Sequence, residues 1–401
     1  MHGYIVCIPM KLSYKYRLYP TREQAEVLQK NLNFCCFLYN CALQERNDHY
    51  KKFGTGVSYG KQSAQLPEIK IEFAEQTQTI YSQSLQQVLK RLDGSYQNFF
   101  RRVKAGADKV GFPRYRSSDR FRSLVFPQAD LKSGGVKLLE NGKLQVSKLP
   151  GELKVKWHRP FQGRCKQVII KKQGDKFYLV LSCDDVPQEL IAKTGKTIAI
   201  DLGLTAFITA DDGTKFHHPK PYKTAKEKLK FLQQKLAAKQ RGSSNRKRAK
   251  QSLARAYERV SNIRDNFLHK VAKQLLVEND TVIIEKLNVK GMLEAKGSCG
   301  AGFEVKKENI QDASWGSFAA LLSYKAERAG KILIEVDPRN TSKMCSCCGN
   351  VKLDLTLRDR EYHCEPCGLA IDRDLNAAKN IRRLGTSLAA DKLLQKLSAL
   401  C

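Results

Sequence analysis

The sequence predicts a multidomain α/β protein, and three regions of different periodicity carry this prediction. Residues 21–112 show the spacing of apolar residues that is typical of helices. Residues 113–187 read as short strands separated by Gly and Pro, and from residue 196 strands alternate with helices, as in an α/β core. A chain of 401 residues is long enough to bury a core in each of two or three domains.

The charge balance indicates a polyanionic partner. Lys and Arg total 71 against 40 Asp and Glu, which gives a formal net charge of +31. Basic side chains that neutralise phosphates release counterions, so a surplus of this size is typical of proteins that bind nucleic acids. The alternative is a solvated basic face with no such partner, and it is disfavoured because the surplus is spread along the whole chain.

The sequence shows no sign of membrane insertion or export. No apolar run approaches the roughly 18 residues that a membrane-spanning helix needs. The apolar stretch 4–10 is too short for a signal peptide and has no cleavage-like tail. The 13 cysteines then indicate reduced thiols rather than a disulfide framework. We therefore expect no membrane partner and a cytoplasmic location, associated with the nucleoid of a bacterium or archaeon.

The helical domain, residues 21–112, begins with a capping box. Thr21 precedes Gln24 by three positions, and in this motif the two side chains satisfy backbone N–H groups at a helix start. Apolar residues then recur at helical spacing over 25–43 and again over 84–103. Lys and Arg line the other faces of the second helix, so we expect this domain to present a basic surface.

A β-rich domain is predicted from residues 113–195 together with residues 1–20. The segment 12–20 alternates and is rich in β-forming residues, as a strand does. Two longer strands flank Gln173-Gly-Asp175, which is a good hairpin signal. Short alternating strands of this kind favour a small β-barrel.

The α/β core is predicted from residues 196–340 and 372–386, with residues 387–401 as a C-terminal tail. Short apolar runs predict buried strands, and longer segments with helical periodicity predict helices. The strands are expected at 197–201, 205–209, 282–285 and 332–336, and the helices at 223–239, 246–278, 315–330 and 374–384.

Residues 341–371 contain two C-x-x-C motifs. Their cysteines are Cys345, Cys348, Cys364 and Cys367. This spacing is typical of a four-cysteine Zn²⁺ site, because two thiolates on a tight turn can face one ion and a second turn completes the tetrahedron. Four protein ligands leave no open coordination position, so we expect a structural zinc. Cys347 is the alternative to Cys348, although its spacing fits less well.

Three acidic residues lie where a carboxylate needs a special explanation. Asp201 and Glu285 each follow an apolar strand, and Asp374 opens the last helix. A carboxylate on a buried strand is costly unless it is paired or bound to a metal. Mg²⁺ prefers oxygen ligands, and two Mg²⁺ ions roughly 4 Å apart can activate water and stabilise the leaving oxygen of a phosphodiester. The three acids therefore predict a metal-dependent nuclease site.

Each acid also has an ordinary structural interpretation. Taken singly, Asp201 is a strand-end acid, Glu285 a turn former and Asp374 a helix N-cap, and for Asp374 alone the cap is the favoured interpretation. Asp372 competes with Asp374 for the metal site, and its alternatives are a role at the exit of the cysteine segment and a pair with Arg373. The occurrence of all three acids in the order strand, strand, helix favours the metal site.

Further motifs carry a family resemblance. They are Tyr14–Pro20, Phe37–Asn40, Tyr96–Arg102, Gly111–Tyr115, Asp201–Gly203, Ile284–Leu287, Ala313–Gly316, Tyr324–Ala326 and Asp372–Ala378. With the cysteine motifs in front of the last segment, the chain resembles the TnpB family over nearly its whole length. These are proteins of bacterial insertion sequences long labelled transposases, and they are compact relatives of type V CRISPR nucleases.

The resemblance implies a fold and an activity. The α/β core would be a RuvC-like (RNase H-fold) nuclease domain with residues 341–371 inserted as a zinc ribbon before its last helix. The helical domain would be a recognition domain and the β domain a wedge-like barrel. Family members bind a guide RNA from the element's end, recognise a short motif beside a double-stranded DNA target and cut both strands with one site, while guide pairing reads the sequence. We expect a monomer with one RNA.

The resemblance also implies roles for individual residues. Asp201, Glu285 and Asp374 match the catalytic, Mg²⁺-binding positions. Contacts to the adjacent DNA motif are expected near Tyr59, Ser63 and Gln86, while Ser82 stands where the family has a lysine. The other side chains expected to contact nucleic acid are Arg101, Arg102, Arg114, Arg246, Lys247 and Arg248.

Three classes of function are compared. The first is an RNA-guided, Mg²⁺-dependent DNA endonuclease. The second is a nuclease-independent RNA- or DNA-binding regulator of transposition or a guided repressor, and the third is a DNA transposase that joins strands. The three acids favour the first class over the second. The third is disfavoured because the sequence shows no separate module that would bind the ends of the element.

Overall fold

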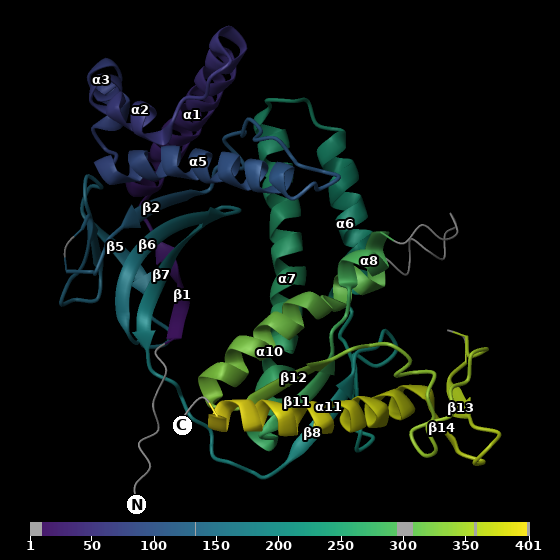
Figure 1. Cartoon of the computed structure of the whole chain (residues 1–401). Helices are drawn as coiled ribbons and strands as arrows, with labels where there is room; N and C mark the ends of the chain where they lie inside the picture. The colour runs from purple at the N-terminus through teal and green to yellow at the C-terminus, as the bar shows by residue number, and fades with distance from the viewer. Residues whose placement is uncertain (1–9, 133, 295–307, 357–358, 399–401) are drawn as a thin grey trace, which may run out of the picture. The chain divides into compact units, whose positions relative to one another are not determined.

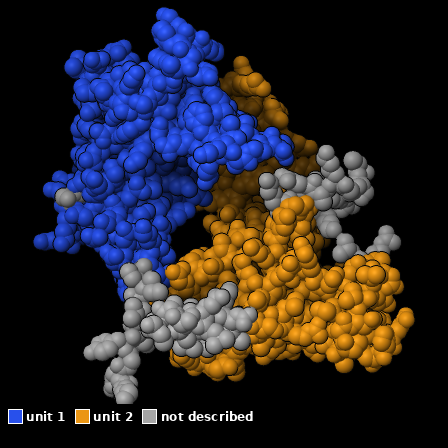
Figure 2. Space-filling model, viewed as in Figure 1, with its two compact units in different colours: residues 1–187 blue, residues 188–401 orange. Residues whose placement is uncertain are grey.

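The chain folds as two units, residues 1–187 and 188–401, which are coloured separately in Figure 2. The computed structural model describes residues 10–132, 134–294, 308–356 and 359–398. The division falls before residue 196, where the sequence placed the start of the α/β core. Residues in front of that position are bonded to the second unit: the Glu189 N–H donates to the Arg328 carbonyl at 2.9 Å.

The first unit contains an antiparallel sheet of seven strands in the order β2-β6-β7-β1-β5-β4-β3. The strands are β1 (Met10–Tyr19), β2 (Ser123–Pro127), β3 (Val136–Leu138), β4 (Leu144–Val146), β5 (Glu152–Lys156), β6 (Arg164–Gln173) and β7 (Lys176–Val186). The N-terminal strand lies inside this sheet, between β7 and β5. Among the described residues the two end strands, β2 and β3, do not pair with each other, so closure into a barrel stays a prediction.

The helices of the first unit lie between β1 and β2 in the sequence. They are α1 (Arg22–Phe53), α2 (Tyr59–Ala64), α3 (Leu66–Glu72), α4 (Ala74–Thr77) and α5 (Ser82–Lys104). The capping box at the start of α1 is confirmed, because Thr21 Oγ1 accepts the Gln24 N–H and the Gln24 side chain accepts the Thr21 N–H. The short helices α2, α3 and α4 escaped prediction because they complete fewer than about two turns and carry little periodicity.

The second unit contains a five-stranded sheet in the order β10-β9-β8-β11-β12. The strands are β8 (Thr197–Asp201), β9 (Ile208–Ala210), β10 (Lys215–Phe216), β11 (Thr281–Glu285) and β12 (Ile332–Val336). β8, β11 and β12 are parallel, and β9 and β10 continue the sheet antiparallel. The strand predicted at 205–209 is displaced, because the chain bends over 204–207 and strand pairing begins at Ile208.

The helices described in the second unit are α6 (Pro221–Ala237), α7 (Ser244–Glu278), α8 (Val289–Glu294), α10 (Trp315–Ala329) and α11 (Arg373–Ser398). Of these, α7 and α10 pack on one face of the second sheet and α11 packs on the other. On β8, Ile198 and Ile200 share a core with α7 and α10, whereas Ala199 shares a core with Ile381 of α11 (Figure 1). In the part of the chain that the structure describes, no helix has both the length and the apolar character needed to cross a membrane.

Helix α11 lies close against the sheet and is longer than predicted. A Cβ built on Gly385 would lie 2.3 Å from Cγ2 of Ile283, so the close approach requires a glycine. The sequence analysis predicted that this helix ends at residue 384, directly before Gly385. That boundary was wrong: Gly385 is a packing residue inside α11, and residues 387–398, expected as a tail, continue the helix.

The segment between β12 and α11 carries a small antiparallel hairpin. It is formed by β13 (Glu361–His363) and β14 (Ala370–Asp372), with Tyr362 paired to Ile371. β14 runs directly into α11, which begins at Arg373. The cysteine segment is therefore joined without a linker to the helix that carries Asp374.

Candidate active site and metal centre

Two of the acids end neighbouring strands. Asp201 is the last residue of β8 and Glu285 the last of β11, and these parallel strands pair Ile200 with Ile284. The carboxyl ends of parallel strands lie at the same edge of a sheet, so the two carboxylates are neighbours. Both residues are buried, with exposed fractions of 9% and 8%.

The third acid reaches the same edge from α11. Asp374 lies in the first turn of this helix. A Cβ built on Gly203, in the loop that follows β8, would lie 3.8 Å from Asp374 Oδ2. The structure therefore brings Asp201, Glu285 and Asp374 to one edge of the sheet, which we call the acidic edge.

The electrostatics of the acidic edge reflect this proximity. Burial raises the pKa of Asp201 well above its usual range, and the charges of Glu285 and Asp374 raise it further. Burial also raises the pKa of Glu285, against the effect of a hydrogen bond from Thr341. Burial and neighbouring negative charge both disfavour the ionised form of a carboxyl group, and a bound cation offsets these effects. The acidic edge is therefore suited to bind a cation.

The carboxylate oxygens are not gathered around one point. Over the residues that the structure describes, only four cysteines form a group of three or more metal-binding side chains with all ligand atoms within 4.8 Å of one another. A pair of ions about 4 Å apart does not require every carboxylate to reach the same ion. The spacing of the three acids therefore does not conflict with a two-ion site.

Asp372, the competitor of Asp374, has a structural role. Its Oδ1 accepts the N–H groups of Asp374 at 2.9 Å and Leu375 at 3.0 Å, and its Oδ2 accepts Lys215 Nζ at 2.8 Å. Burial alone would raise the pKa of Asp372, but these donors lower it below its usual value. Asp372 is therefore the N-cap of α11, and the interpretation of Asp374 as that cap is wrong.

Arg373 brings a positive charge to the acidic edge. Its Nη2 lies 3.2 Å and its Nε 3.4 Å from Asp374 Oδ1, while its Nη1 donates to the Thr356 carbonyl at 3.2 Å. Against the larger effect of burial, the Arg373 charge lowers the pKa of Asp201. The guanidinium therefore offsets part of the repulsion among the acids.

Glu285 is held by the loop that follows β12. The Thr341 hydroxyl donates to Glu285 Oε1 and also lies 3.1 Å from the Pro338 carbonyl. Thr341 is only 2% exposed, so water does not compete for this contact. A buried donor of this kind fixes the orientation of a carboxylate and favours its charged form.

Two asparagines of α11 fix the same loop. Asn380 Nδ2 donates to the carbonyls of Thr341 at 2.9 Å and Met344 at 2.6 Å, and Asn376 Nδ2 donates to the Met344 carbonyl at 2.7 Å. Asn376 Oδ1 accepts the Ser346 N–H at 2.9 Å. Both asparagines are fully buried. The helix that carries the third acid therefore also holds the loop that leads to the first cysteine motif.

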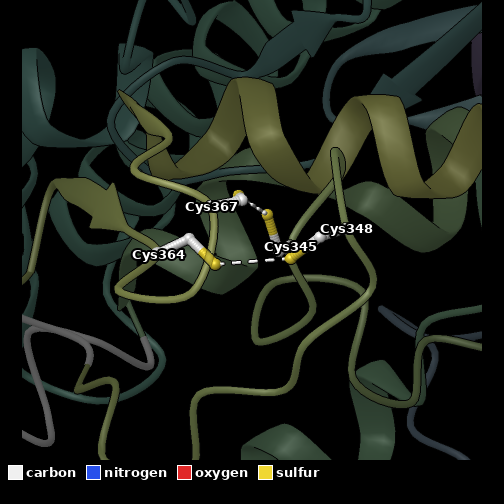
Figure 3. A group of neighbouring side chains, drawn as sticks. All are labelled: Cys345, Cys348, Cys364 and Cys367. Atoms are coloured by element: carbon white, nitrogen blue, oxygen red, sulfur yellow. Dashed lines mark hydrogen bonds between the residues drawn. The ribbon is translucent and has the colours of Figure 1, made fainter.

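The four cysteines of the two motifs form a sulfur cluster (Figure 3). The Sγ atoms of Cys345 and Cys367 are 3.6 Å apart, and those of Cys348 and Cys364 are 3.5 Å apart. Sulfurs at the corners of a tetrahedron with metal–sulfur bonds of about 2.3 Å are about 3.8 Å apart. The cluster therefore fits one four-coordinate metal ion. Cys347, the alternative to Cys348, is exposed and lies outside the group.

Each cysteine motif is closed by a tight turn. The Gly349 N–H donates to the Cys345 carbonyl at 3.0 Å, and the Gly368 N–H donates to the Cys364 carbonyl at 2.8 Å. These glycines have φ of 80° and 69°, a region that side chains disfavour. The glycines therefore let both motifs curl around one point.

The surroundings of the cluster shift the pKa values of two of its thiols in opposite directions. Burial opposes ionisation of Cys345, but hydrogen bonds from the N–H groups of Cys348 and Cys347 and from the side chains of Cys367 and Cys364 together lower the pKa of Cys345 to about 7. Burial raises the pKa of Cys364 to about 12. A divalent ion would stabilise all four thiolates, so metal binding and folding of this segment are coupled.

The residues expected to contact the adjacent DNA motif lie on the helices of the first unit. Tyr59 and Ser63 are half-buried on α2, and Gln86 is exposed on α5. Lys70 Nζ donates to Ser82 Oγ at 2.9 Å. An ammonium from α3 therefore lies beside Ser82, although the side chain at position 82 is not itself a lysine.

The basic residues predicted to contact nucleic acid differ in their availability. Arg101, Arg102 and Arg114 are exposed in the first unit, and Lys247 and Arg248 are exposed at the start of α7. Arg246 is engaged elsewhere. Its Nη1 donates to the carbonyls of Leu236 at 2.9 Å and Lys239 at 2.7 Å, which stabilises the end of α6.

Comparisons with known proteins agree with these features. Residues 181–296 match a family described as "Probable transposase", residues 10–55 match a helix-turn-helix domain of the same family, and residues 315–381 match the TNB domain of Cas12f1-like proteins. A Streptomyces pristinaespiralis protein named as an RNA-guided DNA endonuclease is 32% identical over 95% of this chain and 91% of its own length. The chain belongs to the TnpB family.

Another relative supports membership of the TnpB family. The Escherichia coli K12 protein InsQ, also named as an RNA-guided DNA endonuclease, is 28% identical over 94% of this chain and 93% of its own length. In the segment matched as a helix-turn-helix domain, this TnpB-family chain forms the strand β1 and the single helix α1 rather than two helices joined by a turn.

The TnpB-family fold is shared with a CRISPR nuclease. The Cas12f1 chain in a cryo-EM structure of a Cas12f1–sgRNA–target DNA complex matches 90% of this chain and 83% of its own length, with a TM-score of 0.55 and 15% sequence identity. This likeness shows a compact TnpB/Cas12-like fold that extends over both units.

Sequence reasoning missed the residues that support the acids. Thr341 lies in a loop without any periodic pattern, so nothing in the sequence connected it to Glu285. Asn376 and Asn380 offered a signal, because asparagine is unfavourable inside a helix unless its side chain has a partner. Their spacing of four residues places both on one face of α11.

Proposed function

We propose that this TnpB-family chain is an RNA-guided DNA endonuclease whose Mg²⁺-dependent active site is formed by Asp201, Glu285 and Asp374. The observation that carries the proposal is the meeting of these three acids, two of them buried, at one sheet edge, in a chain whose relatives are named as RNA-guided DNA endonucleases. The formal net charge of +31 supports RNA and double-stranded DNA as partners.

In this proposal the acids act as metal ligands. Mg²⁺ would supply the charge that activates water and stabilises the leaving oxygen of the phosphodiester. Asp201 and Glu285, both with raised pKa values, would have to lose their protons for this role. Thr341 would orient Glu285, and the cap formed by Asp372 would leave the Asp374 carboxylate for the acidic edge.

The proposal includes the domain roles implied by the resemblance. Residues 196–340 and 372–386 form a RuvC-like nuclease domain, residues 21–112 a recognition domain, and residues 1–20 with 113–195 a wedge-like barrel. The acids at the end of a mixed sheet support the first role. The exposed basic residues on α5 support the second.

The proposal also assigns a structural Zn²⁺ to residues 341–371. Cys345, Cys348, Cys364 and Cys367 would hold it, and the sulfur separations of 3.6 and 3.5 Å support a tetrahedral site. A site with four protein ligands has no open position, so this ion would stabilise the segment rather than take part in cleavage. Because the acidic edge and the ribbon share α11, the ribbon would help to fix the active site.

The proposed substrate also implies where the protein acts and which products distinguish it from the alternatives. An enzyme that cuts cellular DNA would act in the cytoplasm, at the nucleoid, and the proposal is one protein copy with one guide RNA. The transposase alternative differs in its product, which is joined strands instead of free ends. The regulator alternative predicts binding without any cleavage.

Sequencing the RNA that co-purifies with the full chain tests the proposal. We expect one defined RNA species, and we expect a DNA duplex that matches its variable end to be cut when Mg²⁺ is present. Moving the matched sequence to a new duplex by changing the RNA should move the cut. RNA-free protein that binds one fixed DNA sequence and leaves it intact would instead support the regulator.

A further inference from the structure

A polar pocket of about 400 Å³ lies in the first unit, on the helices α1 and α5 and the loop that follows α5. Four arginines line it, and we call it the arginine pocket: Arg102, Arg114, Arg116 and Arg120. Its volume is in the lower part of the range of roughly 300–1,000 Å³ that is typical of small-ligand sites. A single nucleotide is a ligand of suitable size.

The positive charge of the arginine pocket is not neutralised by the protein. Within the described residues, none of its four arginines forms an ion pair with a carboxylate. Arg102 Nη2 donates to the Gly111 carbonyl at 3.1 Å, and the Arg116 guanidinium lies 4.9 Å from the centre of the Tyr39 ring. These contacts hold two of the arginines in place while leaving their charge uncompensated.

Acids on the neighbouring helices are committed to other partners. Asp93 of α5 pairs with Arg46 at 3.2 Å. On α1, Glu45 accepts Gln62 Nε2 at 2.6 Å, and Asp48 accepts Gln44 Nε2 at 2.7 Å. Only Asp93 has a cationic partner, since Glu45 and Asp48 are bonded to neutral amides, but none of these three carboxylates lines the pocket.

A fifth arginine, Arg91, adds positive charge close to the arginine pocket. Arg91 lies over the Phe121 ring, 4.7 Å from its centre, and donates to Ser123 Oγ at 3.1 Å. Burial lowers the pKa of Arg91, and the positive charge of Arg116 lowers it further. Like charges held this close to one another favour an anionic ligand.

The loop of the arginine pocket is fixed before any ligand binds. The Arg116 N–H donates to Asn40 Oδ1 at 2.9 Å, and Asn40 Nδ2 donates back to the Arg116 carbonyl at 2.8 Å. The Tyr115 hydroxyl donates to Gln44 Oε1. Because three residues of the loop are tied to α1 or α5, the backbone of the loop loses little freedom on binding, which favours affinity.

An exposed aromatic ring completes the pocket. Tyr115 lines it and is 54% exposed, although its hydroxyl is bound to α1. An aromatic face beside arginines is a common arrangement for unpaired nucleotides, where the base stacks on the ring and the phosphate contacts the guanidinium groups.

We propose that the arginine pocket binds one unpaired nucleotide, with its phosphodiester on Arg102, Arg114, Arg116 and Arg120 and its base on the ring of Tyr115. The inference rests on the proposed function, because the ligand is a nucleotide of the enzyme's own RNA or DNA. It goes beyond that function in naming a nucleotide-binding site remote in sequence from the acids. The shared chemistry of RNA and DNA is a phosphodiester and a base, and the two probes below distinguish the sources.

The test compares binding of two labelled single strands, rU12 and dT12, to the full chain freed of RNA and kept without Mg²⁺. The pocket variant is Arg114→Gln/Arg120→Gln, which leaves in place the two arginines that bond to the loop or stack on Tyr39. The matched control is Lys51→Gln/Lys90→Gln, which removes the same charge from exposed positions of α1 and α5 outside the pocket. Thermal unfolding of each variant checks that the fold is kept.

We expect the pocket variant to bind roughly tenfold more weakly for each phosphate-binding arginine that is replaced. The slope of log affinity against log salt should become shallower by about 0.7 for each of these arginines, and the control should keep the parent slope. Tyr115→Ala should weaken binding by roughly tenfold, whereas Tyr115→Phe, which keeps the ring and loses only the hydroxyl bond to Gln44, should weaken it much less.

The two probes decide the source of the nucleotide. Weaker binding of rU12 alone assigns the arginine pocket to RNA, weaker binding of dT12 alone assigns it to the DNA strand, and weaker binding of both assigns it to the shared chemistry. Equal affinities and equal slopes for the pocket variant and the control would overturn the inference while leaving the proposed function standing. A parent that bound neither probe would also overturn the inference, whereas the proposed function fails only if no defined RNA co-purifies and no matched duplex is cut.

Discussion

Asp201 is the residue at which stability and function conflict most. Its carboxyl group is buried beside two other acids, and burial followed by their charges raises its pKa. An acid whose pKa is raised on folding stabilises the fold most when it is protonated. In metal-free protein this contribution is fully present below the unfolded pKa of about 3.9 and is lost as pH rises through the folded pKa.

We therefore predict that Asp201→Asn stabilises the metal-free protein at neutral pH and abolishes cleavage. The amide removes the buried charge, so the melting temperature in EDTA should rise by about 2–4 °C for each kcal/mol gained and should vary less with pH than in the parent. Thermal unfolding over a pH series, with and without Mg²⁺, measures both effects. A variant that is less stable than the parent in EDTA at neutral pH would contradict the raised pKa of Asp201 in the acidic edge.

Asp372 and Asp374 are separated by one residue and have different roles. Asp372→Ala should destabilise the protein by about 1 kcal/mol, because it removes the N-cap of α11, and it should leave most of the cleavage activity. Asp374→Asn should abolish cleavage with little change in stability. Cleavage assays and denaturant unfolding on the same preparations separate the two residues, and the reversed pattern would show that Asp372 is the metal ligand.

Thr341 is predicted to act through Glu285. Thr341→Val removes the hydrogen bond that lowers the pKa of Glu285, so the acidic limb of the pH–rate profile should move to higher pH and the rate at neutral pH should fall roughly tenfold. Thr341→Ser keeps the hydroxyl and should restore the profile. Single-turnover cleavage at saturating RNA and DNA measures this. An equal decrease at every pH, with no rescue by serine, would indicate a packing role only.

At the scale of elements, α11 connects the features of the second unit. Asp372 caps it, Asp374 lies in its first turn, and Asn376 and Asn380 hold the loop that carries Thr341. Its contact with β11 depends on Gly385, because a Cβ there would lie 2.3 Å from Ile283 Cγ2. The position of this helix therefore sets the geometry of both the acidic edge and the cysteine cluster.

The packing of α11 predicts opposite effects for two glycine substitutions. Gly385→Ala should destabilise the protein by about 1–3 kcal/mol despite the higher helix propensity of alanine, because the sheet has no space for the methyl group. Gly94→Ala on α5 is the matched control. No atom lies within 4 Å of its Cβ position, so the propensity gain of up to about 1 kcal/mol should appear. Denaturant unfolding measures both, and a stable Gly385→Ala protein would contradict the close approach.

Elements with a strong local signal could be predicted from the sequence. The strand β12 and the helices α1, α5 and α7 were located because their apolar residues repeat over several turns or along a whole strand. β10 escaped because two residues carry no period. The boundary at Gly385 was misplaced because a glycine that permits close packing looks the same in sequence as one that ends a helix.

In the candidate site, too, only the features with a local sequence signal could be predicted. The cysteine spacing reflects a local turn, and the sulfur cluster follows from it. The three acids were marked by apolar strands and a helix start. Asp374 taken alone looked like the cap of the last helix, whereas Asp372 forms that cap. The position of a cap depends on where α11 begins, and sequence periodicity fixes a boundary only to within a few residues.

At the scale of the whole molecule, the two units have separate cores and contain different functional features. The first holds the arginine pocket and the exposed basic residues of α5, and the second holds the acidic edge and the sulfur cluster. The formal net charge of +31 favours contact with the phosphates of nucleic acids. The composition alone predicted a nucleic-acid partner, whereas the prediction that RNA guides the protein came only from the family resemblance. Relatives that match more than nine-tenths of the chain, and that are named as RNA-guided DNA endonucleases, now support that prediction.

Cleavage of a guide-matched DNA duplex by the purified protein–RNA complex tests the central claim most directly. The parent and Asp201→Ala should be loaded with the same RNA and assayed with Mg²⁺ and with EDTA. We predict that the parent cuts the matched duplex only with Mg²⁺ and leaves an unmatched duplex intact, and that Asp201→Ala binds the same duplex without cutting it. Equal cutting by Asp201→Ala, or cutting that ignores the match to the RNA, would contradict the account.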